Sequence, residues 1–220
     1  KKITEGMTIT CEDENVGYFS SNNCDEIIQQ FDWADAIAIG PGLGPNEETI
    51  KFVEILISAA NKPLVIDADG LRPFMGNQKL FKEITVPFVI TPHYGEFCRL
   101  TAADSKTIEG EFTSVVTDFM NDFSGILVAK NAPTCVFYKN DGIVNSTGNP
   151  ALATAGTGDV LTGMIAGFIA QGLEPSNAAQ TAVYIHGKAA DLFCDKKGMR
   201  GMIASDLLNT IPTVLADYDD

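Results

Sequence analysis

A short glycine-containing stretch combines the residue types needed to bind an anion and to accept a proton. It reads Gly156-Thr157-Gly158-Asp159 and leads into an apolar segment, Asp159–Ala170, that is typical of a buried helix. Glycines just before a helix let several backbone N–H groups point at one spot, where the helix dipole adds positive potential. Asp159 is then placed to accept a proton from an attacking hydroxyl during phosphoryl transfer. The alternative is that Asp159 only caps the helix.

A lysine at the end of a predicted strand could bring positive charge to the same ligand. Lys130 is followed by Asn131, Ala132, Pro133 and Thr134, and this stretch joins two predicted strands. The lysine can neutralise nucleotide phosphates, and the threonine hydroxyl can add a donor. The alternative is an ordinary hairpin bend with a solvated lysine.

A second glycine-rich stretch, Gly40-Pro41-Gly42-Leu43-Gly44, follows a predicted strand. So many glycines in one strand-to-helix turn indicate close approach of the backbone to a ligand. The stretch is not a Walker A loop, because no Gly-Lys-Ser/Thr follows, and it is not a Gly-x-Gly-x-x-Gly dinucleotide fingerprint.

Two acids and two histidines complete the set of candidate side chains. Asp67 and Asp69 follow a predicted strand, where they either hold Mg²⁺ through water or form a turn with their own side chains. His93 follows another predicted strand and can hydrogen-bond a substrate. His186 lies in the middle of a predicted helix, and we interpret it as a packed structural histidine.

These motifs are positioned by alternating strands and helices. The predicted strands are Ala36–Ile39, Pro63–Ile66, Pro87–Ile90 and Ile126–Ala129, followed by a hairpin of Thr134–Tyr138 and Ile143–Val144 that turns at Asn140-Asp141-Gly142. The predicted helices are Glu47–Ala60, Asp159–Ala170, Pro175–Cys194 and Ile203–Ala216. This alternation predicts an α/β sandwich with a mainly parallel sheet. Ligands bind beyond the carboxyl ends of the strands in such sheets, so the motifs should converge there.

Composition limits the classes of partner. The 220 residues fit one domain, and a net charge of −14 argues against nucleic acid and anionic membranes as bulk partners. No apolar run reaches the roughly 18 residues of a membrane-spanning helix, and no secretory signal pattern is visible. The five cysteines are odd in number and contain no Cys-x-x-Cys, which favours reduced thiols in a cytoplasmic protein.

Taken together and in this order, several motifs resemble the bacterial ADP-dependent NAD(P)H-hydrate dehydratase family. The resemblance spans roughly Ala36 to the end of the chain. The matching segments are Ile39–Gly44, Asp67–Asp69, Thr91–Phe97, Lys130–Thr134, Gly148–Pro150, Gly156–Asp159 and Gly201–Leu207.

The resemblance implies a ribokinase-like three-layer α/β/α sandwich and a hydro-lyase that repairs hydrated NADH and NADPH. ADP phosphorylates the hydroxyl on the damaged nicotinamide ring, and phosphate then leaves to restore the double bond. The implied cofactors are ADP, or ATP in its place, and Mg²⁺. A functional link to an NAD(P)H-hydrate epimerase and a homo-oligomeric state are further expectations.

Residue by residue, the resemblance assigns the adenine nucleotide to two segments, Lys130–Thr134 and Gly156–Gly158. It assigns the hydrated dinucleotide to Gly44, His93 and Asp159, with Asp159 as general base. His93 and the Gly-Thr-Gly-Asp form are similar to the ADP-using bacterial branch rather than to the ATP-using eukaryotic branch.

The chain departs from the family pattern in two places. Asn131 stands where the family usually has Gly after the lysine. Family members also carry a Gly/Ser-rich loop and an Ala-rich helix before the position of Ala36, and Lys1–Asp35 has no such pattern. We therefore expect a single ribokinase-like domain, 1–220, without that segment. Two rival functions remain: a small-molecule kinase of the hydroxyethylthiazole or pyridoxal type, and a non-catalytic nucleotide-binding module.

Overall fold

Short apolar runs form the central sheet of the protein, whose computed structural model describes residues 5–12 and 15–218. The strands are β1 (Ile37–Ile39), β2 (Leu64–Ile66), β3 (Phe88–Ile90), β4 (Ile126–Ala129), β5 (Cys135–Tyr138) and β6 (Asp141–Val144). They lie side by side in the order β1-β2-β3-β4-β5-β6. Strands β1 to β4 are parallel, whereas β5 and β6 are antiparallel to their neighbours. The prediction of a mainly parallel sheet is confirmed.

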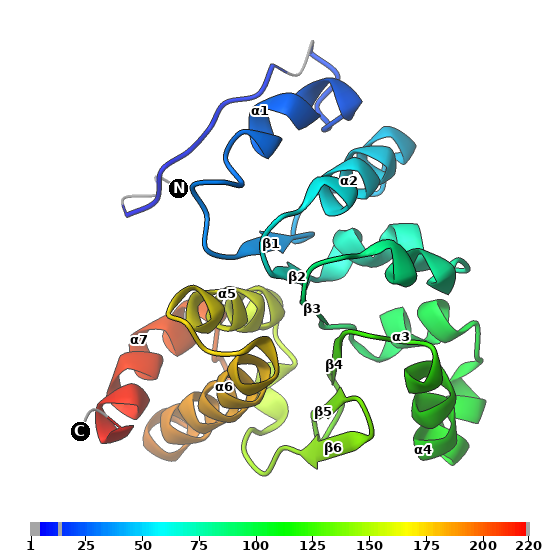
Figure 1. The fold of residues 1–220 in the computed structure, drawn as a ribbon. Helices are drawn as coiled ribbons and strands as arrows, with labels where there is room; N and C mark the ends of the chain where they lie inside the picture. Colours follow the sequence, from blue (N-terminus) through cyan, green and yellow to red (C-terminus); the bar gives the residue numbers. More distant parts are fainter. Residues whose placement is uncertain (1–4, 13–14, 219–220) are drawn as a thin grey trace.

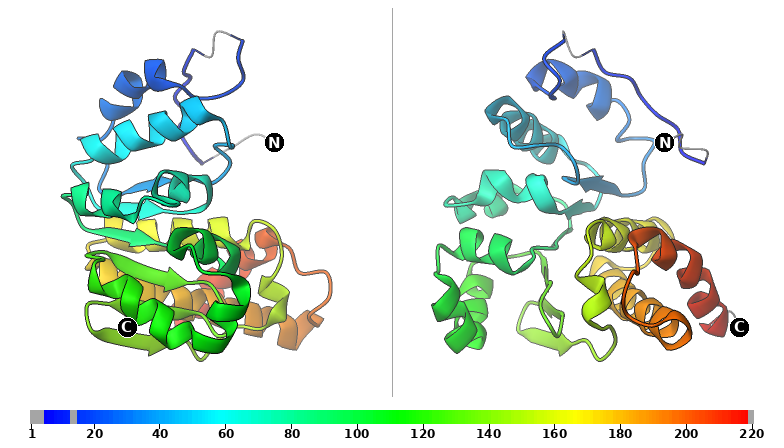
Figure 2. Two further views of the ribbon diagram at one scale, coloured as in Figure 1. Left: turned by 90° about the vertical axis from the view of Figure 1, so that its right-hand side faces the viewer. Right: turned by 180° about the vertical axis from the view of Figure 1, so that it is seen from behind.

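The helices form a layer on each face of the sheet (Figure 1). The first layer contains α2 (Glu47–Ala59), η2 (Ala68–Phe74), η3 (Gln78–Glu83), α3 (Tyr94–Thr101) and α4 (Ser105–Asn121). The second contains α5 (Thr157–Ala170) and α6 (Pro175–Lys197), with α7 (Ala204–Leu215) on their outer side in Figure 2. The shorter elements are η1 (Ser21–Asn23), α1 (Cys24–Ile28), η4 (Pro150–Leu152) and η5 (Ala216–Tyr218).

Alternation along each strand explains the two layers. In β2, Leu64 and Ile66 join the core under α2 and α4, whereas Val65 joins the core under α5 and α6. The same alternation separates Ile90 from Val89 in β3. Successive side chains of a strand point to opposite faces, so a strand that is apolar at every position must be covered on both sides.

Chain order fixes which helices cover which face. The segments that connect β1 to β2, β2 to β3 and β3 to β4 all cross the same face, as right-handed connections between neighbouring parallel strands require. The opposite face is covered only after the β5–β6 hairpin, by α5 and α6. The beginning of α5 is thereby brought back to the sheet from a distant part of the sequence.

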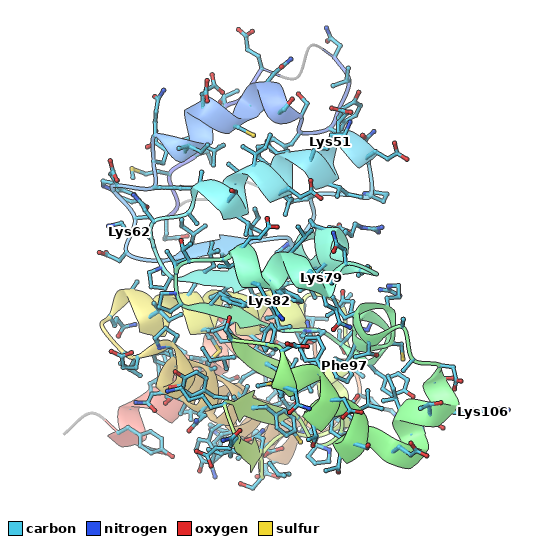
Figure 3. All side chains as sticks on the ribbon, turned by 45° about the vertical axis from the view of Figure 1, so that its right-hand side comes forward. Lys51, Lys62, Lys79, Lys82, Phe97 and Lys106 are labelled. Carbon is cyan, nitrogen blue, oxygen red and sulfur yellow. The ribbon has the colours of Figure 1, made fainter. Side chains whose placement is uncertain are left out.

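A group of phenylalanines anchors the layer that carries α3. Phe74 and Phe81 stack with ring centroids 4.0 Å apart, and Phe119 packs 5.5 Å from Phe97. Figure 3 shows Phe97 on this side of the molecule and Lys79 and Lys82 on the neighbouring η3. Because Phe97 is only 2% exposed, it fixes α3 against the sheet and with it the residues at the start of this helix.

The structure corrects the predicted hairpin turn. Tyr138 pairs with Asp141, so the turn consists of Lys139 and Asn140, and Asp141 and Gly142 belong to β6. Lys139 has a φ of 54°, as a two-residue hairpin turn requires. An Asn-Asp-Gly sequence is the more familiar turn signal, but pairing along the whole of β5 decided the register.

Three α-helices were absent from the predictions: the short α1, and α3 and α4. In the sequence, α3 follows directly after the Thr-Pro-His motif, which hides its start. The sequence of α4 has apolar residues at helical spacing, but a non-helical residue, Glu111, next to Gly110 interrupts the pattern. Across residues 5–12 and 15–218, no helix is both long and apolar enough to cross a membrane.

Candidate active site

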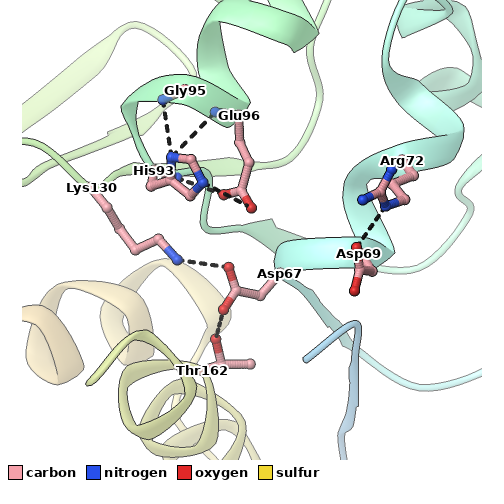
Figure 4. A network of polar contacts seen from close by, with 8 residues as sticks. All are labelled: Asp67, Asp69, Arg72, His93, Gly95, Glu96, Lys130 and Thr162. Atoms are coloured by element: carbon pink, nitrogen blue, oxygen red, sulfur yellow. Dashed lines mark hydrogen bonds and ion pairs between the residues drawn. The ribbon is translucent and has the colours of Figure 1, made fainter. Parts of the chain in front are cut away.

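A buried carboxylate connects three elements at the carboxyl edge of the sheet (Figure 4). Asp67, directly after β2, is 1% exposed. Its Oδ1 accepts a hydrogen bond from Lys130 Nζ at 2.7 Å, and its Oδ2 accepts one from Thr162 Oγ1 at 2.7 Å. Lys130 follows β4 and Thr162 lies on α5. Since parallel strands end at one edge, residues 63 positions apart in sequence meet here.

The first turn of α5 lies against the lysine. Gly156 occupies the N-cap position with a φ of 87°, and no side chain caps the helix. A Cβ atom added to Gly158 would lie 3.2 Å from Lys130 Nζ. The N–H groups of a first helical turn lack partners within the helix and carry positive potential. Exposed Asp159 is next in the same turn. The arrangement therefore combines a cation, amide donors and a carboxylate.

Thr157 turns its side chain inward. Its hydroxyl lies 2.7 Å from the carbonyl oxygen of Leu152 and 2.8 Å from that of Thr154. The residue is 5% exposed. The backbone N–H of Thr157 donates to the carbonyl oxygen of Thr154 at 3.3 Å. This predicted nucleotide-binding residue therefore holds the loop together with both its side chain and its N–H group.

His186, on the neighbouring helix α6, contacts the loop that begins α5. Its Nε2 lies 2.9 Å from the carbonyl oxygen of Thr157. Burial lowers the pKa of His186 from 6.5 to about 4, although the hydrogen bond to Thr157 acts in the opposite direction. The neutral ring therefore donates through Nε2. The prediction of a packed histidine is confirmed, but its contact with the glycine loop had no signal in the sequence.

The Gly148-Asn149-Pro150 motif connects the hairpin to this loop. Asp191 on α6 accepts hydrogen bonds from the backbone N–H of Gly148 and from Nδ2 of Asn149, both at 2.8 Å. Asn149 Oδ1 in turn accepts from the backbone N–H of Ala151 at 3.0 Å, at the start of η4. The motif thus fixes the path of the chain into residues 156–159.

The stretch after Lys130 forms a bend. A cis peptide bond joins Ala132 to Pro133, and both residues are exposed. Thr134 donates its hydroxyl to the carbonyl oxygen of Asn131 at 3.2 Å. The hydroxyl that we expected to face a nucleotide closes the bend in this structure.

His93 lies beside Lys130 and begins α3. The backbone N–H of Lys130 donates to the carbonyl oxygen of Pro92 at 2.9 Å, which places His93 next to the lysine. His93 Nδ1 accepts from the backbone N–H of Gly95 at 3.0 Å, and Glu96 Oε2 accepts from the N–H of His93 at 2.8 Å. The imidazole side chain is 54% exposed, so it is accessible at this edge.

The glycine stretch after β1 has two distinct roles. A Cβ atom on Gly40 would lie 1.7 Å from the carbonyl oxygen of Asp67, so Gly40 is required by the neighbouring backbone rather than by a ligand. Gly44 donates its N–H to Asp69 Oδ2 at 2.9 Å, and Arg72 Nε donates to Asp69 Oδ1 at 2.6 Å. Asp69 therefore links the Gly44 loop to Arg72, which differs from the local turn with a self-bonded side chain that was one of its two predicted roles.

The two acids of the Asp-Ala-Asp motif do not form a metal cage. Figure 4 shows Asp67 facing Lys130 and Thr162, whereas Asp69 faces Arg72. Over the described ranges, no three His, Cys, Asp or Glu side chains are grouped as metal ligands would be. All five cysteines are free thiols.

Three hollows lie elsewhere on the surface. One of 490 Å³ borders η3 and α4, one of 700 Å³ separates α2 from η3, and one of 720 Å³ borders β6 and α6. None of these three is lined by residues 156–159. The loop at residues 155–159 is instead open to solvent, because Ala155 and Asp159 are exposed.

Comparison with known proteins assigns the chain to a family. The family model described as NAD(P)H-hydrate dehydratase matches residues 2–213. This range includes the residues before Ala36, the position at which the sequence resemblance begins. The chain belongs to the NAD(P)H-hydrate dehydratase family. A bifunctional NAD(P)H-hydrate repair enzyme of Moorella thermoacetica is 35% identical over 220 residues. That alignment covers 100% of this chain but only 42% of the relative, so the chain spans less than half of that enzyme's length.

Solved structures agree with the assignment to the NAD(P)H-hydrate dehydratase family. An ADP/ATP-dependent NAD(P)H-hydrate dehydratase from Bacillus subtilis, co-crystallised with ATP and Mg²⁺ and soaked with CoA, superimposes with a TM-score of 0.75 at 32% identity. The match covers 84% of this chain and 67% of that one. A ribokinase-like superfamily protein from Enterococcus faecalis gives a TM-score of 0.75 at 27% identity, covering 90% and 68%. The predicted ribokinase-like fold is confirmed.

Proposed function

We propose that the chain catalyses the ADP-dependent dehydration of hydrated NADH and NADPH through a phosphorylated intermediate. The observation that carries the proposal is the meeting of Lys130 with the first turn of α5, where Asp159 is exposed. This arrangement offers positive charge for a polyphosphate and a carboxylate for a hydroxyl proton. Membership of the dehydratase family supports the choice of reaction.

The residues present fit a nucleotide. The ammonium of Lys130 and the first-turn N–H groups at Gly158 and Asp159 provide donors for phosphate oxygens, and Gly156 leaves the helix start without a competing side-chain cap. The exposed bend at Ala132 and Pro133 would continue the nucleotide contact beyond the phosphates. The B. subtilis relative with ATP and Mg²⁺ supports nucleotide use, and we propose ADP as the donor here.

Asp159 would act as general base. Its carboxylate accepts the proton of the substrate hydroxyl while the hydroxyl oxygen forms a bond to the terminal phosphorus of ADP. The bond from that phosphorus to the bridging oxygen breaks, and AMP leaves. In the second stage the C–O bond breaks, phosphate leaves with the electron pair, and the neighbouring ring carbon loses a proton to restore the double bond. Phosphate is a far better leaving group than hydroxide, which is the reason for the first stage.

The carboxylates at this edge fit Mg²⁺ only as a companion of the nucleotide. Asp67 is held by Lys130 and Thr162, and Asp69 by Arg72 and the N–H of Gly44. Mg²⁺ is commonly bound through substrate phosphates with one or two carboxylates. Mg²⁺ would neutralise phosphate charge when it is bound. Asp159 is an exposed carboxylate in the first turn of α5.

Gly44 and His93 would contact the hydrated dinucleotide. Asp69 fixes the backbone of the Gly44 loop, and the capping bonds of α3 fix the His93 ring. Both residues belong to segments that follow strands of the sheet. They would therefore orient the reacting ring toward Asp159.

The cellular setting follows from the same chemistry. We propose that the chain works beside an NAD(P)H-hydrate epimerase and as a homo-oligomer, in the cytoplasm. The free thiols at all five cysteines support a reducing compartment, and the bifunctional repair enzyme among the relatives supports the link to an epimerase.

The deciding experiment supplies hydrated NADH, ADP and Mg²⁺ and follows absorbance of the restored dihydronicotinamide. Recovery of NADH with release of AMP and phosphate is the expected result. Phosphorylation of an unrelated alcohol without recovery would indicate a small-molecule kinase. Binding of ADP by calorimetry with no turnover of any substrate would indicate a non-catalytic nucleotide-binding module.

A further inference from the structure

The Asp67 carboxylate is buried and hydrogen-bonded to two other side chains of the protein. The residue is 1% exposed, and both carboxylate oxygens have partners at 2.7 Å. A buried charge is costly unless it is paired and hydrogen-bonded, and here Lys130 and Thr162 provide both. The carboxylate therefore has a partner within the protein on each oxygen.

The two partners of Asp67 belong to the two elements that together would bind an anion. Lys130 is the cation at the edge of the sheet, and Thr162 lies one turn into the helix whose first turn offers the amide donors. A lysine side chain has a flexible four-carbon stem and can adopt many rotamers. Because Asp67 binds Lys130 and α5 simultaneously, it limits the ammonium to a position beside Gly158.

We propose that Asp67 is a positioning residue that holds the Lys130 ammonium at the start of α5 so that a phosphate group meets both together. The proposal rests on the proposed function only where it identifies the anion as the phosphates of ADP. Asp67 contributes to binding only through Lys130, and Thr162 contributes only through Asp67.

The first test requires no nucleotide. The intact protein is treated with a small excess of acetic anhydride, and the modification rate of each lysine is read by mass spectrometry. We expect Lys130 to react about tenfold faster in Asp67→Asn than in the wild type, because a buried charged partner has been removed. Lys51 serves as the internal reference, since its partner Glu48 is unchanged.

A matched control separates this effect from the loss of any ion pair. Lys82 and Asp122 form an exposed pair at the same distance of 2.7 Å on a different part of the surface. Asp122→Asn should change the reactivity of Lys82 by less than about twofold, as exposed pairs contribute little. It should leave Lys130 unchanged. Equal Lys130 reactivity in the wild type and Asp67→Asn would overturn the proposal.

The second test measures ADP dissociation constants by calorimetry in a double-mutant cycle. We expect Asp67→Asn to weaken ADP binding about tenfold in the wild-type background and to have no effect in Lys130→Met, because the two residues act as one unit. Thr162→Val should give a smaller loss that also vanishes in Lys130→Met. An equal loss from Asp67→Asn in both backgrounds would show a general structural effect and overturn the proposal.

The tests also separate this proposal from the proposed function. Thermal unfolding of each variant checks folding, and Thr162→Val provides the same cycle if Asp67→Asn does not fold. If the wild type does not bind ADP, the proposed function fails, while the labelling rates still decide whether Asp67 positions Lys130.

Discussion

The imidazole of His186 on α6 lies 2.9 Å from the carbonyl oxygen of Thr157, in the loop that begins α5. This contact joins two helices of the same layer at the position where the proposed phosphate site is formed. It requires a proton on Nε2, and burial keeps the ring neutral otherwise by lowering the pKa of His186 to about 4.

We expect the free energy of unfolding to decrease as the pH is lowered, because of His186. Between pH 6.5 and about 4, the unfolded chain binds a proton that the folded chain does not, so the free energy of unfolding decreases as pH falls. Above pH 6.5 this penalty is absent. The full effect is on the order of 3 kcal/mol, from about 1.4 kcal/mol per pKa unit. Urea unfolding at a series of pH values measures it.

The control variant for this prediction is His186→Gln, which cannot titrate but retains an amide donor. Its stability should be nearly constant from pH 6.5 to 5. Asp104 and Asp122 also have lowered pKa values, but their acid effects begin near the ordinary value of 3.8 and fall mostly below that window. An unchanged pH slope in His186→Gln would contradict the assignment.

Replacing Asp159 by Asn should abolish turnover. The amide is nearly isosteric but cannot accept the hydroxyl proton, so we expect kcat to fall by a factor of about 10² to 10⁴. Because Asp159 is exposed, ADP affinity and thermal stability should change little. Steady-state kinetics and calorimetry measure both quantities, and a near-normal rate would mean that another group is the base.

Replacing Lys130 by Ala should act mainly on nucleotide affinity. Loss of a cation that contacts phosphate weakens ADP binding by about tenfold to a hundredfold, corresponding to one charge-assisted hydrogen bond. The variant also leaves the Asp67 carboxylate buried without its cation, so thermal stability should decrease as well. Calorimetry at fixed ionic strength gives the affinity, and an unchanged dissociation constant would remove Lys130 from the site.

Gly40→Ala should be among the most destabilising single-methyl additions in this chain. The added Cβ would lie 1.7 Å from the carbonyl oxygen of Asp67, which cannot move away without shifting the end of β2. We expect a loss of about 3 kcal/mol or more, or failure to fold. Gly163→Ala is the matched control, because nothing lies within 4 Å of its added Cβ and alanine favours the helix by up to about 1 kcal/mol. Comparable melting temperatures for the two variants would contradict the prediction.

Much of the fold follows from local sequence pattern. The apolar runs that end at Ile66, Ile90 and Ala129 are strands that end at those residues in the structure. Local pattern was weaker where two signals competed. At the hairpin, strand pairing outweighed the Asn-Asp-Gly turn signal. In α4, Gly110 and the non-helical residue Glu111 interrupt an apolar spacing that is otherwise helical.

By itself, the sequence determined which residue types stand at strand ends and before α5, and these residue types carried the resemblance to the dehydratase family. Tertiary structure alone decided which of them meet. Asp67 was an open choice between metal ligand and turn former, and it pairs with Lys130 and Thr162, which are 63 and 95 positions away in sequence. Thr134 and Thr157 each turn a hydroxyl toward their own loop rather than toward a ligand. Residue type and spacing describe what a side chain can bond, but only the packing of the sheet between two helical layers fixes which partner lies within hydrogen-bonding distance.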